Sequence, residues 1–560
     1  SEPDTPALLP ALLPLESDLP PPPPPRDAAI VASSYAAAAA TSNGGVGSKE
    51  FAELATLVPS DLAPLQPQLN EEQMGAVGAI TAHAHGALPY VVYGPPGTGK
   101  TMTMIEAIMQ VLLHHPAPRI LVCAPSNPAT DTLAERLVAM RDAFNQRHAD
   151  MVAAKWMKEN HVSKFHGTNE QLCQRMIPEY WDINTSTLLR LNAQTRGVDF
   201  IKGELLKYCA IDRATGLFKI PDHERLCGAR IIFCTCATAH LLVEAGIPSV
   251  HAPEGVGAGG APYAGKKLHF THEGERHFTH IFVDEASQAL EPEILLPLSL
   301  AGVIDDGGAS DGGPLAAPLK RAEATCGRCT NVVLCGDHMQ LGPMVRSPFC
   351  RSHGLGASLL ERLMALPLYS QASSRVCTRL VRNYRSHEFL LELPSKLYYD
   401  ESLKAHADAK RAKALEQWEE LPTKGCPLLF FGVVGQLSFE AGSTSYWNDV
   451  EASKVASLIQ QLVRVDEHGR PIGGGERTSG EGGDGAAAAG EGDGDGDGGG
   501  GDGDGATPSL KTSDVAVVTL FRKQVLKIRQ LLRKIGLGAV RVGTVDDYQG
   551  QEEKVVIIST

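Results

Sequence analysis

The sequence predicts an α/β fold built on parallel sheets, and three observations support this prediction. Apolar runs of strand length recur along the chain, at residues 88–93, 120–124, 230–233, 280–283 and 331–335. Stretches with helical spacing, such as residues 102–113, lie between them. Glycine or polar residues follow the runs closely. Strands that alternate with helices form parallel sheets, in which ligands bind beyond the carboxyl ends of the strands.

The first of these strand ends carries the run Gly94-Pro95-Pro96-Gly97-Thr98-Gly99-Lys100-Thr101, which fits the pattern Gly-x4-Gly-Lys-Ser/Thr. Between a strand and a helix, this pattern predicts a P-loop. Its glycines let backbone N–H groups surround phosphates, and the helix N-terminus adds positive potential. Lys100 is placed to reach the β- and γ-phosphates of ATP, and the Thr101 hydroxyl to bind Mg2+.

Two carboxylates follow the strand predicted at residues 280–283. Asp284 is placed to bind Mg2+, and Glu285 to orient and deprotonate an attacking water. An Asp-Glu pair after an apolar run is common in solvated loops and alone is weak evidence for a site. The P-loop that precedes it in the chain makes the catalytic interpretation strong. The strand predicted at residues 331–335 is followed by Gln340, whose amide could sense the γ-phosphate.

Three further segments complete the set of candidate motifs. Tyr384 is placed to stack on adenine, and Arg385 to reach the γ-phosphate from another domain. Gln73, upstream of the P-loop, could bind an adenine edge. The last segment covers residues 542–552. Each motif alone is equally well explained by a loop or a turn, but the order of all six along the chain is not.

This order of motifs resembles that of superfamily 1 helicases over residues 69–560, and within them the 5′-to-3′ group that includes the nonsense-mediated-decay helicase. A closer resemblance links the chain to the Armitage and silencing-defective RNA helicases, relatives of the Moloney leukemia virus 10 protein. It depends on segments outside the general motifs, at residues 278–286, 340–343, 347–349, 353–363, 427–430, 432–433, 522–525 and 527–529.

The resemblance implies two tandem RecA-like P-loop domains with parallel sheets, and it implies roles for further residues. Ser126, Asn127 and Thr235 match residues that contact the nucleic-acid backbone from the first domain, and Thr544 matches one from the second. Glu552 matches a contact to the nucleotide ribose. The residues alone do not indicate these roles, because a lone Ser or Thr after a strand is usually a helix cap.

The resemblance also implies a function, which is 5′-to-3′ translocation on single-stranded RNA driven by ATP hydrolysis, in RNA silencing or mRNA turnover. Protein partners would then come from those machineries. The expected location is the cytoplasm, with ribonucleoprotein granules and the nucleus not excluded. Two alternatives stay open: a DNA or RNA–DNA hybrid helicase of the same superfamily, and a nucleotide-dependent RNA clamp without motor activity.

Comparison with the family pattern also leads us to expect an incomplete chain. The motif that carries the family's arginine finger would lie beyond Thr560, and the accessory domains expected upstream of Gln73 do not occur in the sequence. We therefore expect these 560 residues to bind nucleotide but to show little turnover.

The predicted organisation has two domains, insertions and disordered segments. Residues 69–366 form the first RecA-like domain, with an inserted subdomain at about 141–228, and residues 374–560 form the second domain, truncated at its C-terminus. Residues 1–60, rich in Pro and Ala, and the Gly/Asp tract at 473–505 cannot bury enough apolar surface to fold. Within the second domain the pattern predicts a strand, a helix and a strand at residues 428–434, 450–463 and 514–520.

The formal net charge of −14 is concentrated in two segments. Residues 471–506 carry nine acids against Arg477, and residues 1–50 carry six acids against two bases. The remaining residues together hold a charge of only −2, so a local basic groove for nucleic acid is compatible with the composition. No stretch fits a transmembrane helix or a signal peptide, so we expect no membrane partner. The twelve cysteines lack framework spacing, which predicts reduced thiols.

Overall fold

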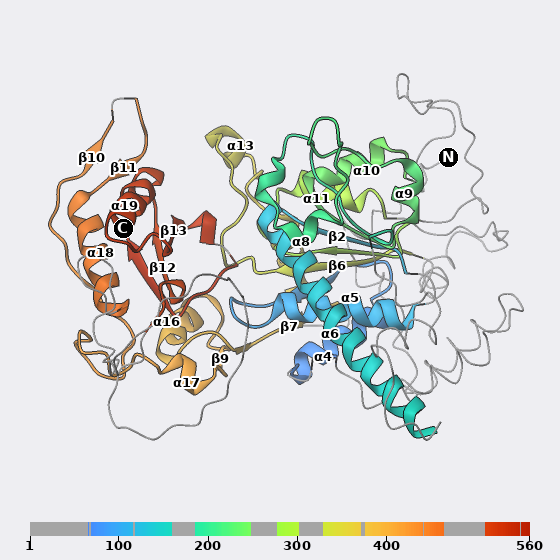
Figure 1. Ribbon diagram of the computed structural model, residues 1–560, viewed down its shortest axis with the longest axis horizontal. Coiled ribbons are helices and arrows are strands. Elements are labelled where there is room, and N and C mark those ends of the chain that lie inside the picture. Colours follow the sequence, from blue (N-terminus) through green and yellow to red (C-terminus); the bar gives the residue numbers. More distant parts are fainter. Residues whose placement is uncertain are drawn as a thin grey trace, which may run out of the picture. The chain divides into compact units, whose positions relative to one another are not determined.

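The computed structural model describes residues 65–66, 69–83, 85–115, 118–159, 185–247, 277–301, 329–370, 376–440, 442–463, 510–548 and 550–560. The chain divides into two compact units, Ser1–Val381 and Arg382–Thr560 (Figure 1). The two segments predicted to be disordered, residues 1–60 and 473–505, lie outside the described residues.

The first unit is built on a seven-stranded sheet with the order β3-β4-β2-β5-β6-β1-β7. Every pair of neighbouring strands in it is parallel. The strands are β1 (Tyr90–Tyr93), β2 (Ile120–Ala124), β3 (Leu188–Arg190), β4 (Ile231–Thr235), β5 (His280–Val283), β6 (Asn331–Gly336) and β7 (Cys377–Arg379). Strands β1, β2, β4, β5 and β6 are buried along their whole length, as apolar runs in a parallel sheet are. The five strands predicted in this unit are confirmed.

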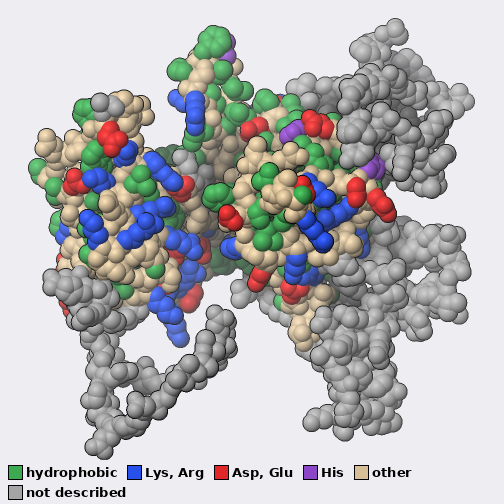
Figure 2. All heavy atoms as spheres, turned by 45° about the horizontal axis from the view of Figure 1, so that its top comes forward, with side chains coloured by type: hydrophobic (Ala, Val, Ile, Leu, Met, Phe, Trp, Pro, Cys, Tyr) green, Lys and Arg blue, Asp and Glu red, His purple; other side chains and the backbone are tan. Residues whose placement is uncertain are grey.

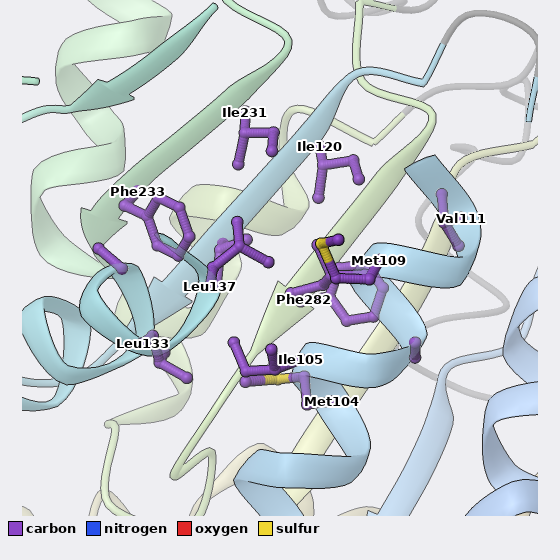
Figure 3. Packing of buried hydrophobic residues seen from close by; sticks show 14 of the residues in the cluster. Met104, Ile105, Met109, Val111, Ile120, Leu133, Leu137, Ile231, Phe233 and Phe282 are labelled. Atoms are coloured by element: carbon purple, nitrogen blue, oxygen red, sulfur yellow. The ribbon is translucent and has the colours of Figure 1, made fainter. Parts of the chain in front are cut away.

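Two helices of the first unit form the layer that positions the P-loop. α5 (Lys100–His114) and α6 (Asn127–Glu159) pack on one face of the sheet (Figure 3). Met104 and Met109 of α5 and Leu137 of α6 lie against the strands that carry Phe233 and Phe282. Full burial of side chains of this size is worth about 1.5–3 kcal/mol each. The layer therefore fixes α5, whose first residue is Lys100.

The other helices of the first unit are short. They are α4 (Glu71–Thr81), α8 (Gly203–Leu206), α9 (His223–Gly228), α10 (His240–Glu244), α11 (Glu291–Leu298), α13 (Pro348–Ser352), α14 (Leu359–Met364) and α15 (Pro367–Ser370), with the 3-10 turns η3 (Val198–Phe200) and η4 (Ala237–Ala239).

The boundaries of the first unit differ from those predicted. β7 pairs with β1, and the N–H of Leu380 donates to the carbonyl oxygen of Tyr93 at 2.8 Å. The first unit therefore extends to Val381, beyond the predicted limit at residue 366. β3 pairs with β4, so residues 188–190 belong to the main sheet rather than to an inserted subdomain. Both β3 and β7 have three residues, too few to form a recognisable apolar run.

The second unit contains a three-stranded parallel sheet with the order β13-β12-β14. Its strands are β12 (Val515–Thr519), β13 (Arg541–Thr544) and β14 (Val555–Ser559). α18 (Asp449–Val463) and α19 (Arg522–Lys534) share a core with the sheet, in which Ile459 and Ile528 are fully buried. The predicted helix at 450–463 and strand at 514–520 are confirmed.

The remaining elements of the second unit are small. They are α16 (Glu388–Tyr398), α17 (Ala409–Ala412), η5 (Thr512–Asp514), η6 (Asp546–Tyr548), the pair β8 (Arg382–Asn383) and β9 (Lys404–Ala405), and the pair β10 (Ser438–Phe439) and β11 (Tyr446–Trp447). Within the described ranges, no helix is both long and apolar enough to cross a bilayer.

The strand predicted at residues 428–434 is wrong. These residues have irregular backbone, and Phe430 and Val434 are 92% and 99% exposed. The ring of Phe431 packs under the ammonium of Lys454, with Nζ 3.5 Å from the ring centroid. An apolar run becomes a strand only where a sheet edge pairs with it, and in the described part of this unit β12 pairs with β13 and β14 instead.

The stability of the first unit should fall on acidification because of His85. This side chain is fully buried, and its Nδ1–H donates to the carbonyl oxygen of Leu88 at 2.6 Å. Burial lowers the pKa of His85 from 6.5 to about 4. As the pH falls below 6.5, His85 binds a proton in the unfolded chain before it does so in the folded chain. The free energy of unfolding therefore decreases progressively down to pH 4.

Between pH 7 and pH 5 the loss from His85 should be about 2 kcal/mol. His85→Asn keeps a donor for Leu88 but does not titrate. Urea midpoints at the two pH values should therefore fall less for the variant than for the wild type. Equal falls in both proteins would contradict the assignment.

Candidate functional site

The candidate residues of the first unit follow neighbouring strands of the sheet. β5, β6 and β1 are consecutive in the strand order, and β2 and β4 continue the row beyond β5. Asp284 follows β5, Asp337 follows β6, and the P-loop follows β1. Neighbouring strands are about 4.8 Å apart, so Asp284 and the P-loop start roughly 10 Å apart along one edge. The strand order thus brings together residues that are far apart in the sequence.

The P-loop backbone requires glycine at two positions. Gly97 and Gly99 have φ angles of 76° and 82°, in the left-handed region that glycine adopts without strain. A Cβ atom on Gly99 would lie 2.4 Å from Nε2 of Gln73. α5 begins directly after the loop, so its first N–H groups and its dipole favour an anion there.

The side chain of Lys100 is buried in the P-loop. Its Nζ donates to the carbonyl oxygens of Gly94 at 2.7 Å and Pro95 at 3.3 Å, and the residue is 8% exposed. Among the described residues, no carboxylate forms an ion pair with this ammonium. The charges of Asp284 and Glu285 lie near this ammonium without a direct ion pair, so it is suited to bind an anionic ligand.

Asp284 and Glu285 form a buried acidic pair after β5. The Thr101 hydroxyl donates to Oδ2 of Asp284 at 3.2 Å, and the Glu285 N–H donates to Oδ1 at 2.9 Å. Burial raises the pKa of Asp284, against the opposing charge of Lys100. Burial, and next the charge of Asp284, raise the pKa of Glu285. A carboxylate with a raised pKa is a stronger base, which suits Glu285 to accept a proton from water.

Glu285 is also held in an unusual backbone conformation. Its φ angle is 51°, which for a non-glycine residue costs about 1–3 kcal/mol. The amide of Gln288 donates to Oε2 of Glu285 at 2.9 Å and fixes the carboxylate. Strain of this kind persists where the surrounding structure determines the position of a side chain.

Thr101 and Asp284 provide oxygen ligands for Mg2+. The 3.2 Å separation of Oγ1 and Oδ2 fits two adjacent ligands of an octahedral ion that binds oxygen at about 2.0–2.1 Å. In the described part of the chain, no group of three or more His, Cys, Asp or Glu could enclose a metal. Mg2+ bound here would therefore take phosphate oxygens and waters as its other ligands.

Gln340 is held at the end of β6, the strand beside β1. Its Nε2 donates to Oδ2 of Asp337 at 2.6 Å, and the Met339 N–H donates to Oδ1 at 3.0 Å. Asp337 is fully buried and was not among the predicted site residues. Asp337 therefore fixes the Gln340 amide beyond the end of β6, the strand next to the one that carries the P-loop.

Gln73 contacts the P-loop directly. Its Nε2 donates to the carbonyl oxygen of Thr98 at 3.0 Å, and its Oε1 accepts from the Asn70 N–H at 2.9 Å. The Asn70 side chain accepts from the Gln73 N–H in return, which completes a capping box at the start of α4. Gln73 therefore braces the loop in this structure, and its contact with adenine stays a prediction.

In the second unit, Arg385 and Glu552 form an ion pair. Nε of Arg385 donates to Oε2 of Glu552, and Arg411 donates to Oε1 at 3.2 Å. Burial acts to raise the pKa of Glu552, but the two arginines outweigh it and lower the pKa. Tyr384, predicted to stack on adenine, is 39% exposed. The pair orients Arg385 and keeps Glu552 ionised.

Ser126, Thr235 and Thr544, predicted to contact nucleic acid, each cap a helical turn. Their hydroxyl oxygens accept from the N–H group three residues further on, at 3.3, 3.1 and 3.3 Å. Ser126 and Thr235 follow the neighbouring strands β2 and β4, so they lie at the same sheet edge as the P-loop. The hydroxyls of Ser126 and Thr544 can still donate to a phosphate, whereas Oγ1 of Thr235 also hydrogen-bonds to Oγ1 of Thr238 at 2.6 Å.

Known proteins match both parts of the chain. Residues 68–196, and residues 355–473 with 504–560, each match a family model described as an AAA domain. RNA helicase Mov10l1 of Homo sapiens is 33% identical over 507 residues, which cover 88% of this chain and 30% of that protein. Its Mus musculus counterpart is 32% identical over 504 residues, covering 88% and 31%. The mov-10-B.1 protein of Danio rerio is 32% identical over 503 residues, covering 88% and 37%.

The chain belongs to the MOV10-like group of superfamily 1 helicases. It spans about a third of the length of these relatives. A solved complex of Arterivirus nonstructural protein 10 (helicase) with DNA covers 60% of this chain and 44% of that chain, at 12% identity and a TM-score of 0.22. That score carries no weight, and the α/β fold rests on the strand order and the two AAA matches.

The predictions missed the arginine network that holds Asn127. Arg190, fully buried at the end of β3, donates to Asp131 at 2.9 Å and to Oδ1 of Asn127 at 3.0 Å. Arg196 donates to the same two side chains at 3.1 and 3.4 Å. The available signal was an arginine inside an apolar run, which requires a buried partner. The network occupies Oδ1 of Asn127 and leaves its NH2 group to donate.

Removal of the Lys100 ammonium should weaken nucleotide binding. Lys100→Ala should reduce the affinity for ATP by about 10- to 100-fold, because a hydrogen bond to a charged group is worth about 1.5–3 kcal/mol. Titration with a fluorescent ATP analogue measures the change. Lys219→Ala removes an exposed lysine of the same unit and should leave the affinity unchanged. Equal affinities for all three proteins would refute the P-loop assignment.

Proposed function

We propose that this chain is the motor core of an ATP-dependent RNA helicase. One observation carries the proposal: the P-loop, the Asp284–Glu285 pair and the hydroxyls of Ser126 and Thr235 lie along one edge of one sheet. These hydroxyls cap helical turns and also lie where a nucleic-acid backbone could be contacted beside the phosphate site. The relatives named RNA helicase Mov10l1 favour RNA as the substrate.

The residues of this edge are suited to phosphoryl transfer to water. Lys100 and the N–H groups of the P-loop bind the β- and γ-phosphates and neutralise charge that develops on them. Glu285 accepts a proton from a water whose oxygen attacks the γ-phosphorus, and the bond to the bridging oxygen breaks. Mg2+, held by Thr101 and Asp284, would supply positive charge to the same phosphates. The products are ADP and phosphate.

Hydroxyl and amide groups at strand ends suit a motor that moves along any sequence. Contacts to the sugar–phosphate backbone carry no sequence information, so each step meets the same chemistry. The nucleotide site and the candidate contacts to the nucleic-acid backbone lie close together on one sheet. A shift of the residues around the nucleotide can therefore move the residues that contact RNA.

Finer features of the proposal rest on the resemblance of the motif order to the 5′-to-3′ group of superfamily 1 helicases, and the use of Mg2+ rests also on the oxygen pair of Thr101 and Asp284. These features are 5′-to-3′ movement, use of Mg2+, protein partners from RNA silencing or mRNA turnover, and a cytoplasmic location.

Substitution of the two carboxylates should separate their roles. Glu285→Gln should keep Mg·ATP binding but slow hydrolysis by about 10²–10⁴-fold, because the general base is lost. Asp284→Asn should instead raise the Mg2+ concentration needed for half-maximal binding. Single-turnover hydrolysis of labelled ATP and a magnesium titration measure both effects. A Glu285→Gln protein that hydrolyses ATP at the wild-type rate would show that another residue is the base.

In the full-length protein, hydrolysis should respond to single-stranded RNA. The rate should rise with RNA and the affinity for RNA should fall steeply with salt, because each phosphate contact releases counterions with a slope of about −0.7 per contact. Duplexes with a 5′ overhang should unwind faster than those with a 3′ overhang. Stimulation by single-stranded DNA with RNA inert would favour the DNA helicase alternative. Tight RNA binding without any RNA-stimulated hydrolysis would favour the clamp.

A further inference from the structure

The C-terminal half of α19 presents basic side chains around a surface hollow. The helix contains six bases and no acid, namely Arg522, Lys523, Lys527, Arg529, Arg533 and Lys534. The first three form ion pairs with Asp547, Glu440 and Asp449. Arg529 donates to the carbonyl oxygen of Val542 at 3.0 Å. Arg533 and Lys534 have no carboxylate partner among the described residues. Figure 2 shows Lys and Arg side chains gathered on the visible face of this unit, at the left.

The hollow is shallow, and its lining residues follow one another along one face of α19. Its volume is about 590 Å3, and it is lined by Leu526, Arg529, Gln530, Arg533 and Lys534. Leu526 is 51% exposed, so the floor offers apolar contact as well as charge. A surface with positive charge and no acid in its lining attracts anions.

The topology places the last turn of α19 away from the candidate nucleic-acid contact of the second unit. β12 and β13 are parallel, and α19 connects them, so the helix returns the chain from the carboxyl edge to the amino edge of the sheet. The last turn of α19, with Arg533 and Lys534, therefore lies toward the amino edge. Thr544 ends β13 at the carboxyl edge. Thr544 and the last turn of α19 therefore lie toward opposite edges, whereas Arg529 bonds to Val542, two residues before Thr544.

The acidic tract of the same unit enters the structure at the amino edge. Residues 476–504 carry nine acids and one base. Five residues separate Asp504 from Leu510, which is buried in the same core as Leu532 of α19 and precedes β12. An extended chain spans about 3.4 Å per residue, so these few residues reach roughly 20 Å, about the length of α19. At its other end the tract follows α18, which packs against α19 (Figure 1).

We propose that the acidic tract, residues 476–504, binds the α19 hollow in cis, with its carboxylates on Arg529, Arg533 and Lys534. The short connection to Leu510 gives the tract an effective concentration of about millimolar at the hollow. Bound there, the tract covers a basic face that would otherwise attract RNA and other polyanions without regard to their sequence. The proposal does not depend on the helicase function.

A competition experiment tests the occupant. In a tract-neutral variant of the full chain, every Asp and Glu of residues 476–504 is replaced by Asn or Gln. A fluorescein-labelled peptide with the native sequence of the tract is titrated onto both proteins and followed by anisotropy. The peptide should bind the tract-neutral chain about 5-fold or more tightly than the wild type, since the native tract competes in cis. Binding should disappear at about 1 M salt, where the Debye length is about 3 Å.

Matched substitutions locate the site. Arg533→Glu with Lys534→Glu in the tract-neutral chain should abolish peptide binding. Lys404→Glu with Lys410→Glu changes the charge of the same unit by the same amount at exposed positions outside the hollow, and should leave binding unchanged. Equal peptide affinity for wild type and tract-neutral chain, or equal loss in both double variants, would overturn the proposal.

Cross-linking of the unaltered chain provides a second measurement that no variant can confound. A carbodiimide couples lysine to a carboxylate only when the two are in contact. Lys534 should couple to acids of the tract at low salt, and Lys404 and Lys410 should not. Couplings spread evenly over all three lysines would contradict the proposal. A second result would also contradict the proposal. If binding of a single-stranded RNA oligonucleotide required Arg533 and Lys534 and binding of the tract peptide did not, nucleic acid would be the occupant of the hollow.

Discussion

The buried charges of Lys100, Asp284 and Glu285 are the constraint on which the rest of the first unit depends. The ammonium is held by backbone carbonyl oxygens of its own loop, and it opposes the effect of burial on the pKa of both carboxylates. These groups are stable near each other only because an apolar sheet and α5 hold them in fixed positions. The arrangement offers positive charge to a triphosphate, and it offers carboxylates to a water molecule and a metal ion.

Parallel strands explain how one sheet edge serves two ligands. The order β4-β2-β5-β6-β1 places the backbone-contact candidates on the first two strands and the phosphate groups on the last three. β5, with Asp284 at its end, is the strand of the second set that lies next to β2. Thr544, the candidate backbone contact of the second unit, likewise lies at the carboxyl edge of a small parallel sheet. The last turn of α19 lies toward the other edge, where Leu510 precedes β12.

The sequence was informative where local chemistry decides the structure. β2 and β5 were predicted to the residue, because an apolar run buried on both faces has sharp ends. The run at residues 428–434 is similarly apolar but pairs with no strand in the described part of the chain, and no local pattern reveals this. The brace between Gln73 and Thr98 and the network around Asn127 were also missed, since their hydrogen bonds join segments far apart in the sequence. The features that were predicted follow from local propensity, whereas those that were missed depend on tertiary pairing.

The most direct test is a crystal structure of the chain with Mg2+ and a non-hydrolysable ATP analogue. We expect the β- and γ-phosphates within hydrogen-bonding distance of Nζ of Lys100 and of the P-loop N–H groups. The ammonium should have left the carbonyl oxygens of Gly94 and Pro95, and Mg2+ should lie between Thr101 and Asp284. A nucleotide bound elsewhere, or a Lys100 still bonded to those carbonyl oxygens beside a bound nucleotide, would contradict the account.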